Sequence, residues 1–417
     1  MIEQEKNTVI FKPSKENTDK DGQESAARSF MSSLLEMDNL LVLAGSGTSL
    51  TFNPDENNNW IAPGMWDLWN ECKEIKDFDT VKTTVQYDAV QTQKDNKGNS
   101  KDDIELLLSL VDQQLMFEQD ETQKERLKTF KKSAIDAVFN ATNFVQNKAK
   151  ELEKKWSSHT QFINKLGLRK IKQSRLKIFT TNYDMAFEQA ASNEGFVVID
   201  GFDFGQPQRF NPMWYEYDIV RRADRQGQNG SYLESVVHLY KLHGSCDWRR
   251  VNHEVVKSAT DSAEGDKVII YPSSNKYKSS YDSPYLDMIS SFTQALKQPN
   301  TALICVGYGF NDEHLNNAIT MALRTNTSMH LLAVSPSMFE GKDENGNPDV
   351  SNADVNKHTS FKILHKLITE NESKRVGLLA ANFSEFVTLI PMHIHQDPDV
   401  LLQRGERATL TIGTKND

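Results

Sequence analysis

The sequence predicts an α/β protein with a doubly wound parallel sheet and a mostly helical subdomain inserted into it. Two observations support this fold class. Short apolar runs, typical of buried parallel strands, alternate along the chain with helical patterns. Most of these runs also end in a cluster of small or polar residues. Because the carboxyl ends of parallel strands share one edge of the sheet, we expect the clusters to converge on one crevice.

The elements of this Rossmann-like arrangement can be read in chain order. The expected strands are the apolar runs at 39–44, 176–180, 196–199, 236–242, 301–306 and 330–334. Between the first two, apolar residues at 104, 107, 108 and 111 have helical spacing, and Asp102 or Asp103 can cap that helix. Further expected elements are helices at 26–37, 121–154, 157–166, 185–193 and 361–370, a small hairpin at 247–266 and an element of uncertain type at 383–389.

This pattern divides the chain into three parts. The start of the chain is polar and charged, so we expect a flexible arm over residues 1–30. One domain then covers residues 31–390 and carries the helical insertion at about 63–173. Residues 391–417 are expected to form a C-terminal tail.

Composition narrows the classes of function. The chain has 417 residues and a formal net charge of −10, which argues against broad nucleic-acid binding through clustered Lys and Arg. Cys72, Cys246 and Cys305 are the only cysteines and are far apart, so they form neither a disulfide framework nor a paired zinc motif. No run approaches the roughly 18 apolar residues of a membrane span, and the N-terminus has no apolar leader. We therefore expect a cytoplasmic protein without membrane contact.

The first cluster, Gly45-Ser-Gly-Thr-Ser49, directly follows the first expected strand. Glycines allow a tight turn and bring backbone N–H groups close to phosphate oxygens. The third glycine of the dinucleotide fingerprint is absent, because Leu50 stands in its place. From this motif alone, phosphate binding and a plain strand-to-helix turn are equally supported.

Two further clusters follow later strands. Asn182 and Asp184 offer an amide and a carboxylate that can hold a ribose hydroxyl or a water, although such residues also start helices, and capping is the simpler interpretation. His243 ends the run at 236–242 and can act as a general base near neutral pH, whereas a lone His is more often structural. The other nine histidines have no comparable setting and form no metal motif.

The fourth cluster runs from Val306 to Asp312. Its glycines, Gly307 and Gly309, suggest a second close approach of the backbone to a ligand. The alternative is a turn followed by a helix that Asn311 or Asp312 caps.

The order of the four clusters resembles that of the sirtuin family. Gly-Ser-Gly-Thr-Ser comes first, then Thr-Thr-Asn-Tyr-Asp, Leu-His-Gly and Val-Gly-Tyr-Gly-Phe. The series is most similar to the divergent sirtuin-like domains of bacterial anti-phage defence proteins, such as the sirtuin-like subunit of sirtuin–HerA systems. The resemblance covers residues 31 to 390 and is close only at the four clusters.

The resemblance implies roles for the matching positions. Asn182 and Asp184 would face the nicotinamide ribose, and His243 would be the catalytic histidine. The implied cofactor-binding residues are Gly45, Ser46, Gly47, Ser49, Gly307, Gly309, Asn311 and Ser335.

Departures from the sirtuin pattern decide between activities. Sirtuin deacylases carry a four-cysteine zinc module, which this chain cannot form, so no metal is expected. Thr181 replaces the usual Gln, and Pro63-Gly-Met-Trp66 stands roughly where a Pro-Asp-Phe-Arg segment is usual. These departures favour an NAD⁺ glycohydrolase, which cleaves NAD⁺ to nicotinamide and ADP-ribose, over a deacylase.

The resemblance also implies a biological role and partners. NAD⁺ depletion would make the chain an anti-phage effector, restrained by homo-oligomerisation or by a HerA-type DNA-translocating ATPase. Two alternatives stay open: an NAD-dependent protein deacylase, and a non-catalytic NAD or ADP-ribose-binding module of a larger complex.

Overall fold

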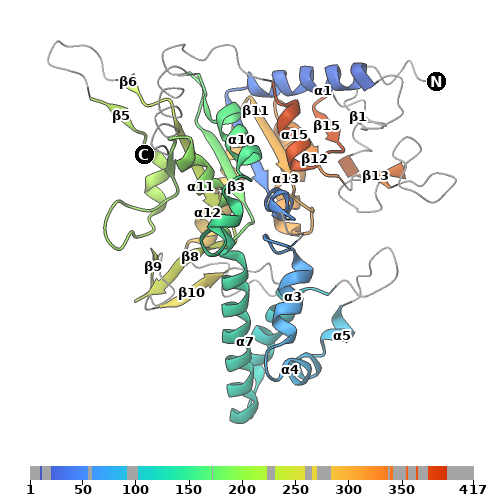
Figure 1. Cartoon of the computed structure of the whole chain (residues 1–417), viewed down its shortest axis with the longest axis vertical. Helices are drawn as coiled ribbons and strands as arrows, with labels where there is room; N and C mark the ends of the chain where they lie inside the picture. Colours follow the sequence, from blue (N-terminus) through green and yellow to red (C-terminus); the bar gives the residue numbers. More distant parts are fainter. Residues whose placement is uncertain are drawn as a thin grey trace, which may run out of the picture.

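The protein is described here by a computed structural model (Figure 1). The described residues are 10–11, 20–54, 59–91, 102–170, 172–222, 231–258, 265–269, 283–336, 339–340, 354–355, 363–364 and 374–391. Most of the expected arm, most of the expected helix at 361–370 and the tail from residue 392 lie outside these residues.

A parallel sheet of eight strands forms the centre of the molecule and confirms the predicted doubly wound fold. In spatial order the strands are β1 (Ile10–Phe11), β15 (Val376–Leu379), β12 (His330–Val334), β11 (Thr301–Val306), β2 (Asn39–Ala44), β3 (Leu176–Thr180), β7 (Val236–Lys241) and β4 (Val197–Ile199). The chain runs outward from β2 on one side, then returns to β11 on the other. The topological switch point therefore lies between β2 and β11.

Each face of the sheet is covered by helices, because alternate side chains of a strand point to opposite faces. In β2, Leu41 and Leu43 join one core, whereas Leu40 and Val42 join the other. The first core is covered by α12 (Tyr285–Lys297) and α13 (Glu313–Thr325). The second is covered by α1 (Lys20–Leu35), α10 (Ser157–Gly167), α11 (Ala186–Asn193) and α15 (Phe383–Leu389).

Between β2 and β3 the described chain is helical. It forms α2 (Ser46–Ser49), η2 (Leu50–Phe52), α3 (Met65–Lys73), α4 (Phe78–Thr84), α5 (Tyr87–Val90), α6 (Ile104–Phe117), α7 (Glu121–Thr142), α8 (Phe144–Asn147), α9 (Ala149–Leu152) and α10. Helices α3 to α7 project away from the sheet (Figure 1) and share a core of their own. Asp103 caps α6 by accepting bonds from the Glu105 and Leu106 N–H groups, so the cap is the second of the two predicted aspartates.

A small antiparallel sheet lies against this helical block. Its order is β10 (Asp266–Ile269), β8 (Gly244–Val251) and β9 (Glu254–Lys257), so the predicted hairpin gains a third strand. Lys267 holds the sheet to α7 by an ion pair of 2.8 Å with Asp136. The remaining described elements are η3 (Pro212–Glu216), β5 (Val220–Arg221), β6 (Ser231–Tyr232), β13 (Phe339–Glu340) and β14 (Asp354–Val355).

Several boundaries differ from the expectations. Helix α1 spans Lys20–Leu35, whereas the expected helix covered residues 26–37. The helical pattern at 121–154 is divided into α7, α8 and α9. Strands β1 and β15 were not predicted, because two and four residues are too few for periodicity to separate a strand from a helix. Of the helices that the structure describes, none is both long and apolar enough for a membrane crossing.

Candidate active site

All the predicted site residues lie beyond the carboxyl ends of five neighbouring strands, β12, β11, β2, β3 and β7. Ser335 follows β12, and Gly307, Gly309 and Asn311 follow β11. Gly45, Ser46, Gly47 and Ser49 follow β2. Asn182 and Asp184 follow β3, and His243 follows β7. The parallel register aligns these positions, since Val306 pairs with Ala44 and Thr180 pairs with Lys241. The structure therefore brings the predicted residues to one edge of the sheet.

The glycines after β2 and β11 allow two backbone loops to touch. A Cβ atom at Gly45 would lie 2.6 Å from the Gly307 carbonyl oxygen, and one at Gly47 would lie 2.7 Å from the Gly307 Cα. Gly307 has φ +61°, and a Cβ there would lie 2.5 Å from the Thr48 nitrogen. The Gly45 and Gly47 N–H groups donate to the Val306 and Gly307 carbonyls at 3.1 and 3.0 Å. Gly45 and Gly47 thus allow the two loops to contact each other, and their N–H groups donate to carbonyl oxygens of the protein.

Asn182 and Asp184 connect the end of β3 to helix α2. The Ser49 hydroxyl donates to Asp184 Oδ2 at 2.7 Å, and the Ala186 N–H donates to Asp184 Oδ1 at 3.0 Å. Asn182 Nδ2 donates to the hydroxyls of Thr48 at 3.1 Å and Ser49 at 3.0 Å. Asp184 therefore supports the start of α11 and also orients Ser49, so the capping interpretation covers only half of its contacts.

His243 is paired with a carboxylate from the neighbouring loop. His243 Nε2 lies 3.2 Å from Asp312 Oδ2, and the two side chains are only 6% and 4% exposed. The other oxygen, Asp312 Oδ1, accepts bonds from the His314 and Leu315 N–H groups at the start of α13. Asp312 is thus the helix cap that the sequence allowed and also the partner of His243, a role that the sequence did not reveal.

The helical insertion adds an acidic group to this edge. The Tyr183 hydroxyl donates to Glu105 Oε1 at 2.9 Å. Burial, together with the negative charge of Asp103, raises the pKa of Glu105 to about 7, although the charge of His243 opposes the shift. Sequence reasoning missed Glu105, because nothing in a helical pattern says which of its acidic residues faces a strand end.

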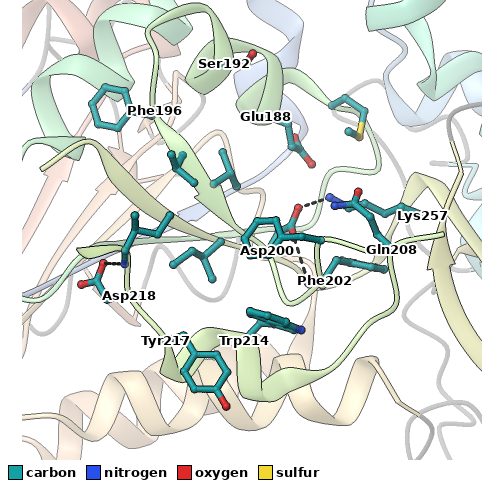
Figure 2. A pocket seen from close by; sticks show the side chains of 16 residues that line it. Glu188, Ser192, Phe196, Asp200, Phe202, Gln208, Trp214, Tyr217, Asp218 and Lys257 are labelled. Carbon is teal, nitrogen blue, oxygen red and sulfur yellow. Dashed lines mark hydrogen bonds and ion pairs between the residues drawn. The ribbon is translucent and has the colours of Figure 1, made fainter. Parts of the chain in front are cut away.

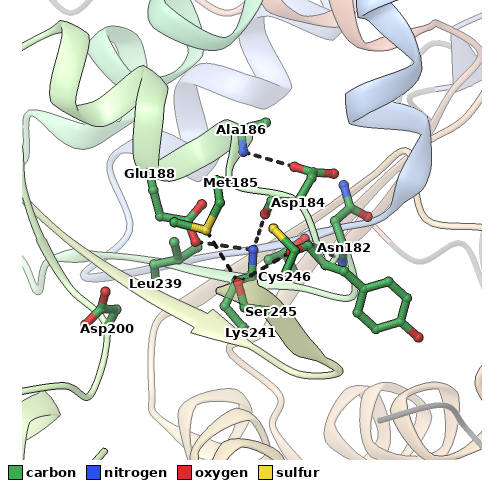
Figure 3. Close-up of polar contacts among 12 residues, drawn as sticks. Asn182, Asp184, Met185, Ala186, Glu188, Asp200, Leu239, Lys241, Ser245 and Cys246 are labelled. Atoms are coloured by element: carbon green, nitrogen blue, oxygen red, sulfur yellow. Dashed lines mark hydrogen bonds and ion pairs between the residues drawn. The ribbon is translucent and has the colours of Figure 1, made fainter. Parts of the chain in front are cut away.

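A buried lysine lies beneath the loop that carries Asp184. Lys241 is 2% exposed, and its ammonium group donates to the Asp184 carbonyl oxygen and lies 3.2 Å from Glu188 Oε1 (Figure 3). Burial alone would lower the pKa of Lys241, but the charges of Glu188 and Asp184 outweigh it and raise that pKa. Lys241 therefore stays charged and connects the main chain of the site to α11.

The described residues offer no cluster of three or more His, Cys, Asp or Glu side chains suited to a metal ion. A cavity of about 470 Å³ lies beside β4, and none of the predicted site residues lines it. At the carboxyl edge, in contrast, the polar side chains of Ser49, Asn182 and Asp184 bond to one another.

Fold and site together define a doubly wound α/β protein whose polar site residues gather at the carboxyl edge around the switch point, the place where such sheets bind ligands. Residues 176–353, less than half of the chain, match a family described as SIR2-like domain. This segment includes Asn182, Asp184, His243 and Asp312, whereas the loop at Gly45 precedes it. No curated protein matches the chain.

The similar solved structures include sirtuins. A mutant Sir2 homologue in complex with 2′-O-acetyl ADP-ribose is 12% identical, with 93% of this chain and 99% of that chain covered and a TM-score of 0.34. A mutant Sir2 homologue in complex with ADP-ribose is 11% identical, with the same coverage and a TM-score of 0.35. A structure concerned with sirtuin substrate affinity is 10% identical, covers 87% of this chain and 96% of its own, and has a TM-score of 0.35. At these TM-scores the likenesses carry no argument about ligands or chemistry.

Proposed function

We propose that the chain is an NAD⁺ glycohydrolase, which binds NAD⁺ at the carboxyl edge of the sheet and cleaves it to nicotinamide and ADP-ribose. The observation that carries the proposal is the buried pair of His243 and Asp312. His243 follows β7, the strand next to the one that presents Asn182, and Asp312 comes from the loop after β11. The SIR2-like match over residues 176–353 supports it, because all three residues lie within that segment.

In the proposed reaction, Asp312 fixes the tautomer of His243. With the Nε2–H bonded to the Asp312 carboxylate, Nδ1 is the nitrogen that accepts a proton. It takes this proton from a ribose hydroxyl or from the attacking water. The bond between nicotinamide and ribose breaks, its electrons leave with neutral nicotinamide, and the water oxygen bonds to the ribose carbon. Asn182 and Asp184 hold the ribose in this scheme.

The proposed nucleotide contacts come from the loops that follow β2, β11 and β12. Ser46 and Asn311 have exposed side chains and can reach a bound molecule. Ser49 and Ser335 are buried, and Gly309 is exposed, so we propose that these residues shape the floor and rim of the crevice. Gly45, Gly47 and Gly307 act indirectly in this proposal, by holding the β2 and β11 loops together.

We further propose that this activity serves anti-phage defence in the cytoplasm, by depletion of NAD⁺. The domain at 31–390, with its insertion at about 63–173, would carry the reaction, and the ends of the chain would contact other subunits. Homo-oligomerisation or a HerA-type ATPase would restrain the enzyme. Light scattering on the purified chain tests self-assembly, and co-purification with such an ATPase tests the partner; a persistent monomer that captures no ATPase would contradict this part.

The direct test is chromatography of NAD⁺ after incubation with the purified protein. We expect wild type to release nicotinamide and ADP-ribose, and His243→Ala to lose at least about 100-fold in rate, as when a general base is removed. His253→Asn is the matched control, because His253 is exposed in the β8–β9 turn with φ +70°, which Asn tolerates.

Three results would contradict the glycohydrolase. Full activity of His243→Ala would remove the assigned base. Turnover of an acylated peptide, with NAD⁺ consumed only in its presence, would indicate a deacylase. Binding of NAD⁺ without cleavage, even with a co-purified partner, would indicate a non-catalytic binding module.

A further inference from the structure

A cavity of about 470 Å³ runs along β4, the edge strand of the central sheet (Figure 2). Its volume is within the range of small-molecule sites, roughly 300 to 1,000 Å³. Most of the lining is apolar and comes from β4, from α11 and from the segment at 202–219. Trp214 and Tyr217 lie on the opposite side of the cavity from Glu188 and Ser192 (Figure 2).

Aromatic side chains remain uncovered at the rim of this cavity. Phe204 is 74% exposed and Tyr217 is 51% exposed, although both line the space. The Phe204 and Trp214 rings meet edge to face at 5.3 Å, and Trp214 meets Tyr217 in the same way at 5.4 Å. Such a wall favours a flat apolar body, and it also favours a positive charge near the ring faces.

Acidic side chains outnumber basic ones in the lining of the cavity. The charged lining residues are three carboxylates, Glu188, Asp200 and Asp218, and one ammonium group, Lys257. Lys257 forms an ion pair with Asp200, and Asp218 at the outer end pairs with Arg175 at 3.0 Å. When ionised, the four charged lining residues carry a formal charge of −2, which favours a cation in the cavity. Lys241 and Arg175, which do not line the cavity, pair with Glu188 and Asp218 and offset part of this charge.

Glu188 has a carboxylate oxygen that no described residue satisfies. Its Oε1 lies 3.2 Å from Lys241 Nζ, whereas its Oε2 is buried and has no hydrogen-bond partner among the described residues. A buried acceptor of this kind costs free energy until a donor reaches it. Burial raises the pKa of Glu188 despite the nearby charge of Lys241, which is consistent with a shortage of donors.

We propose that this cavity is a second ligand-binding site, for a small organic cation whose aromatic body fills the space beside β4 and whose nitrogen donates to Glu188 Oε2. The site lies outside the crevice at the carboxyl edge, and it does not depend on NAD⁺ chemistry. Recognition rests on two features together, the aromatic rim around Trp214 and the unsatisfied acceptor Oε2 of Glu188.

The test is isothermal titration of the full chain with three indoles of similar size. Tryptamine carries an ammonium group, tryptophol is neutral and indole-3-propionate is an anion. We expect wild type to bind tryptamine at least about tenfold more tightly than tryptophol, because a hydrogen bond between charged groups is the stronger kind, and to bind indole-3-propionate weakest of the three.

Variants of the cavity separate charge from shape. Glu188→Gln removes the charge, so tryptamine and tryptophol should bind equally. Ser192→Trp places a large ring at the exposed rim position on α11 and should weaken both ligands. Glu74→Gln is the matched control, because Glu74 is exposed and lies at the end of α3, outside the cavity. Its affinities should equal those of wild type.

The proposal is overturned by any of three results. These are no tryptamine binding by wild type at millimolar concentration, equal affinity of wild type for the three indoles, and an unchanged preference for tryptamine in Glu188→Gln. If Ser192→Trp fails to fold, as judged by circular dichroism, the Glu188→Gln titration still decides the question. Loss of NAD⁺ cleavage has no part in this test, so the two proposals fail independently.

Discussion

The carboxyl-edge site and the cavity beside β4 are built in opposite ways. At the carboxyl edge, Ser49, Asn182 and Asp184 bond to one another, and His243 bonds to Asp312. In the cavity, the Glu188 Oε2 atom has no partner among the described residues. A network whose members satisfy one another fixes its geometry before any ligand arrives, whereas an unsatisfied acceptor depends on the ligand for its donor. The first arrangement suits positioning for chemistry, and the second suits capture of a ligand.

The largest expected effect comes from a substitution that disturbs the backbone contact between the β2 and β11 loops at the carboxyl edge. Gly307→Ala puts a Cβ within 2.5 Å of the Thr48 nitrogen at φ +61°, so we expect it to lower the free energy of unfolding by about 3 kcal/mol. Gly309→Ala is the control, since its Cβ meets only the end of the Asn311 side chain, and it should cost less than about 1 kcal/mol. Urea unfolding of both variants measures the difference, and equal stabilities would show that the loops separate easily.

The next largest effect tests whether Asp312 contributes to catalysis through His243. Asp312→Asn should lower kcat for NAD⁺ cleavage by about 100-fold with little change in KM, because a neutral amide cannot stabilise a protonated imidazole. Stability should be nearly unchanged, since Asn caps helices as well as Asp does. Steady-state kinetics and a thermal melt give the two values. Wild-type kcat in this variant would assign Asp312 to helix capping alone.

The smallest effect concerns Glu105 and pH. Its pKa is about 7 in the folded protein, above the usual value of 4.5, so the folded state holds the proton more tightly than the unfolded state. The resulting stability is present below pH 4.5 and is lost as pH rises through 7, by at most about 1.4 kcal/mol per pH unit.

Glu105→Gln should remove this part of the pH dependence, so its stability relative to wild type should rise between pH 5 and pH 8. Urea unfolding at both values measures the change, with Glu74→Gln as an exposed control. A constant difference between wild type and Glu105→Gln across this range would show that Glu105 is ionised throughout.

The strands of the central sheet were predictable because burial on both faces makes them continuous apolar runs. The exceptions are β1, whose two residues lie within the expected arm, and β15, whose four residues, Val376–Leu379, include a glycine and give no usable period. The hairpin at 247–266 was partly predictable, but pairing of β10 with β8 depends on residues distant in sequence. Local patterns therefore identified most strands and did not reveal which distant segments join them.

The residues of the candidate site were also predictable only in part. Gly45, Asn182 and His243 were predictable as positions, because each follows a strand and the carboxyl ends must share an edge. Glu105 was not, because it reaches Tyr183 from the insertion. The cavity beside β4 was not predictable either, because its lining combines β4, α11 and the segment at 202–219, and a missing donor leaves no trace in a sequence.

Lys241 connects these two regions through its contacts. One ammonium group contacts the Asp184 carbonyl on the side of the proposed NAD⁺ site and Glu188 on the side of the cavity. If a cation at Glu188 changes the affinity for a nucleotide by some factor, linkage requires the nucleotide to change the affinity for that cation by the same factor. Titrating tryptamine with and without ADP-ribose therefore measures the coupling, and unequal affinities would mean that binding at one region is transmitted to the other, with Lys241 as the contact they share.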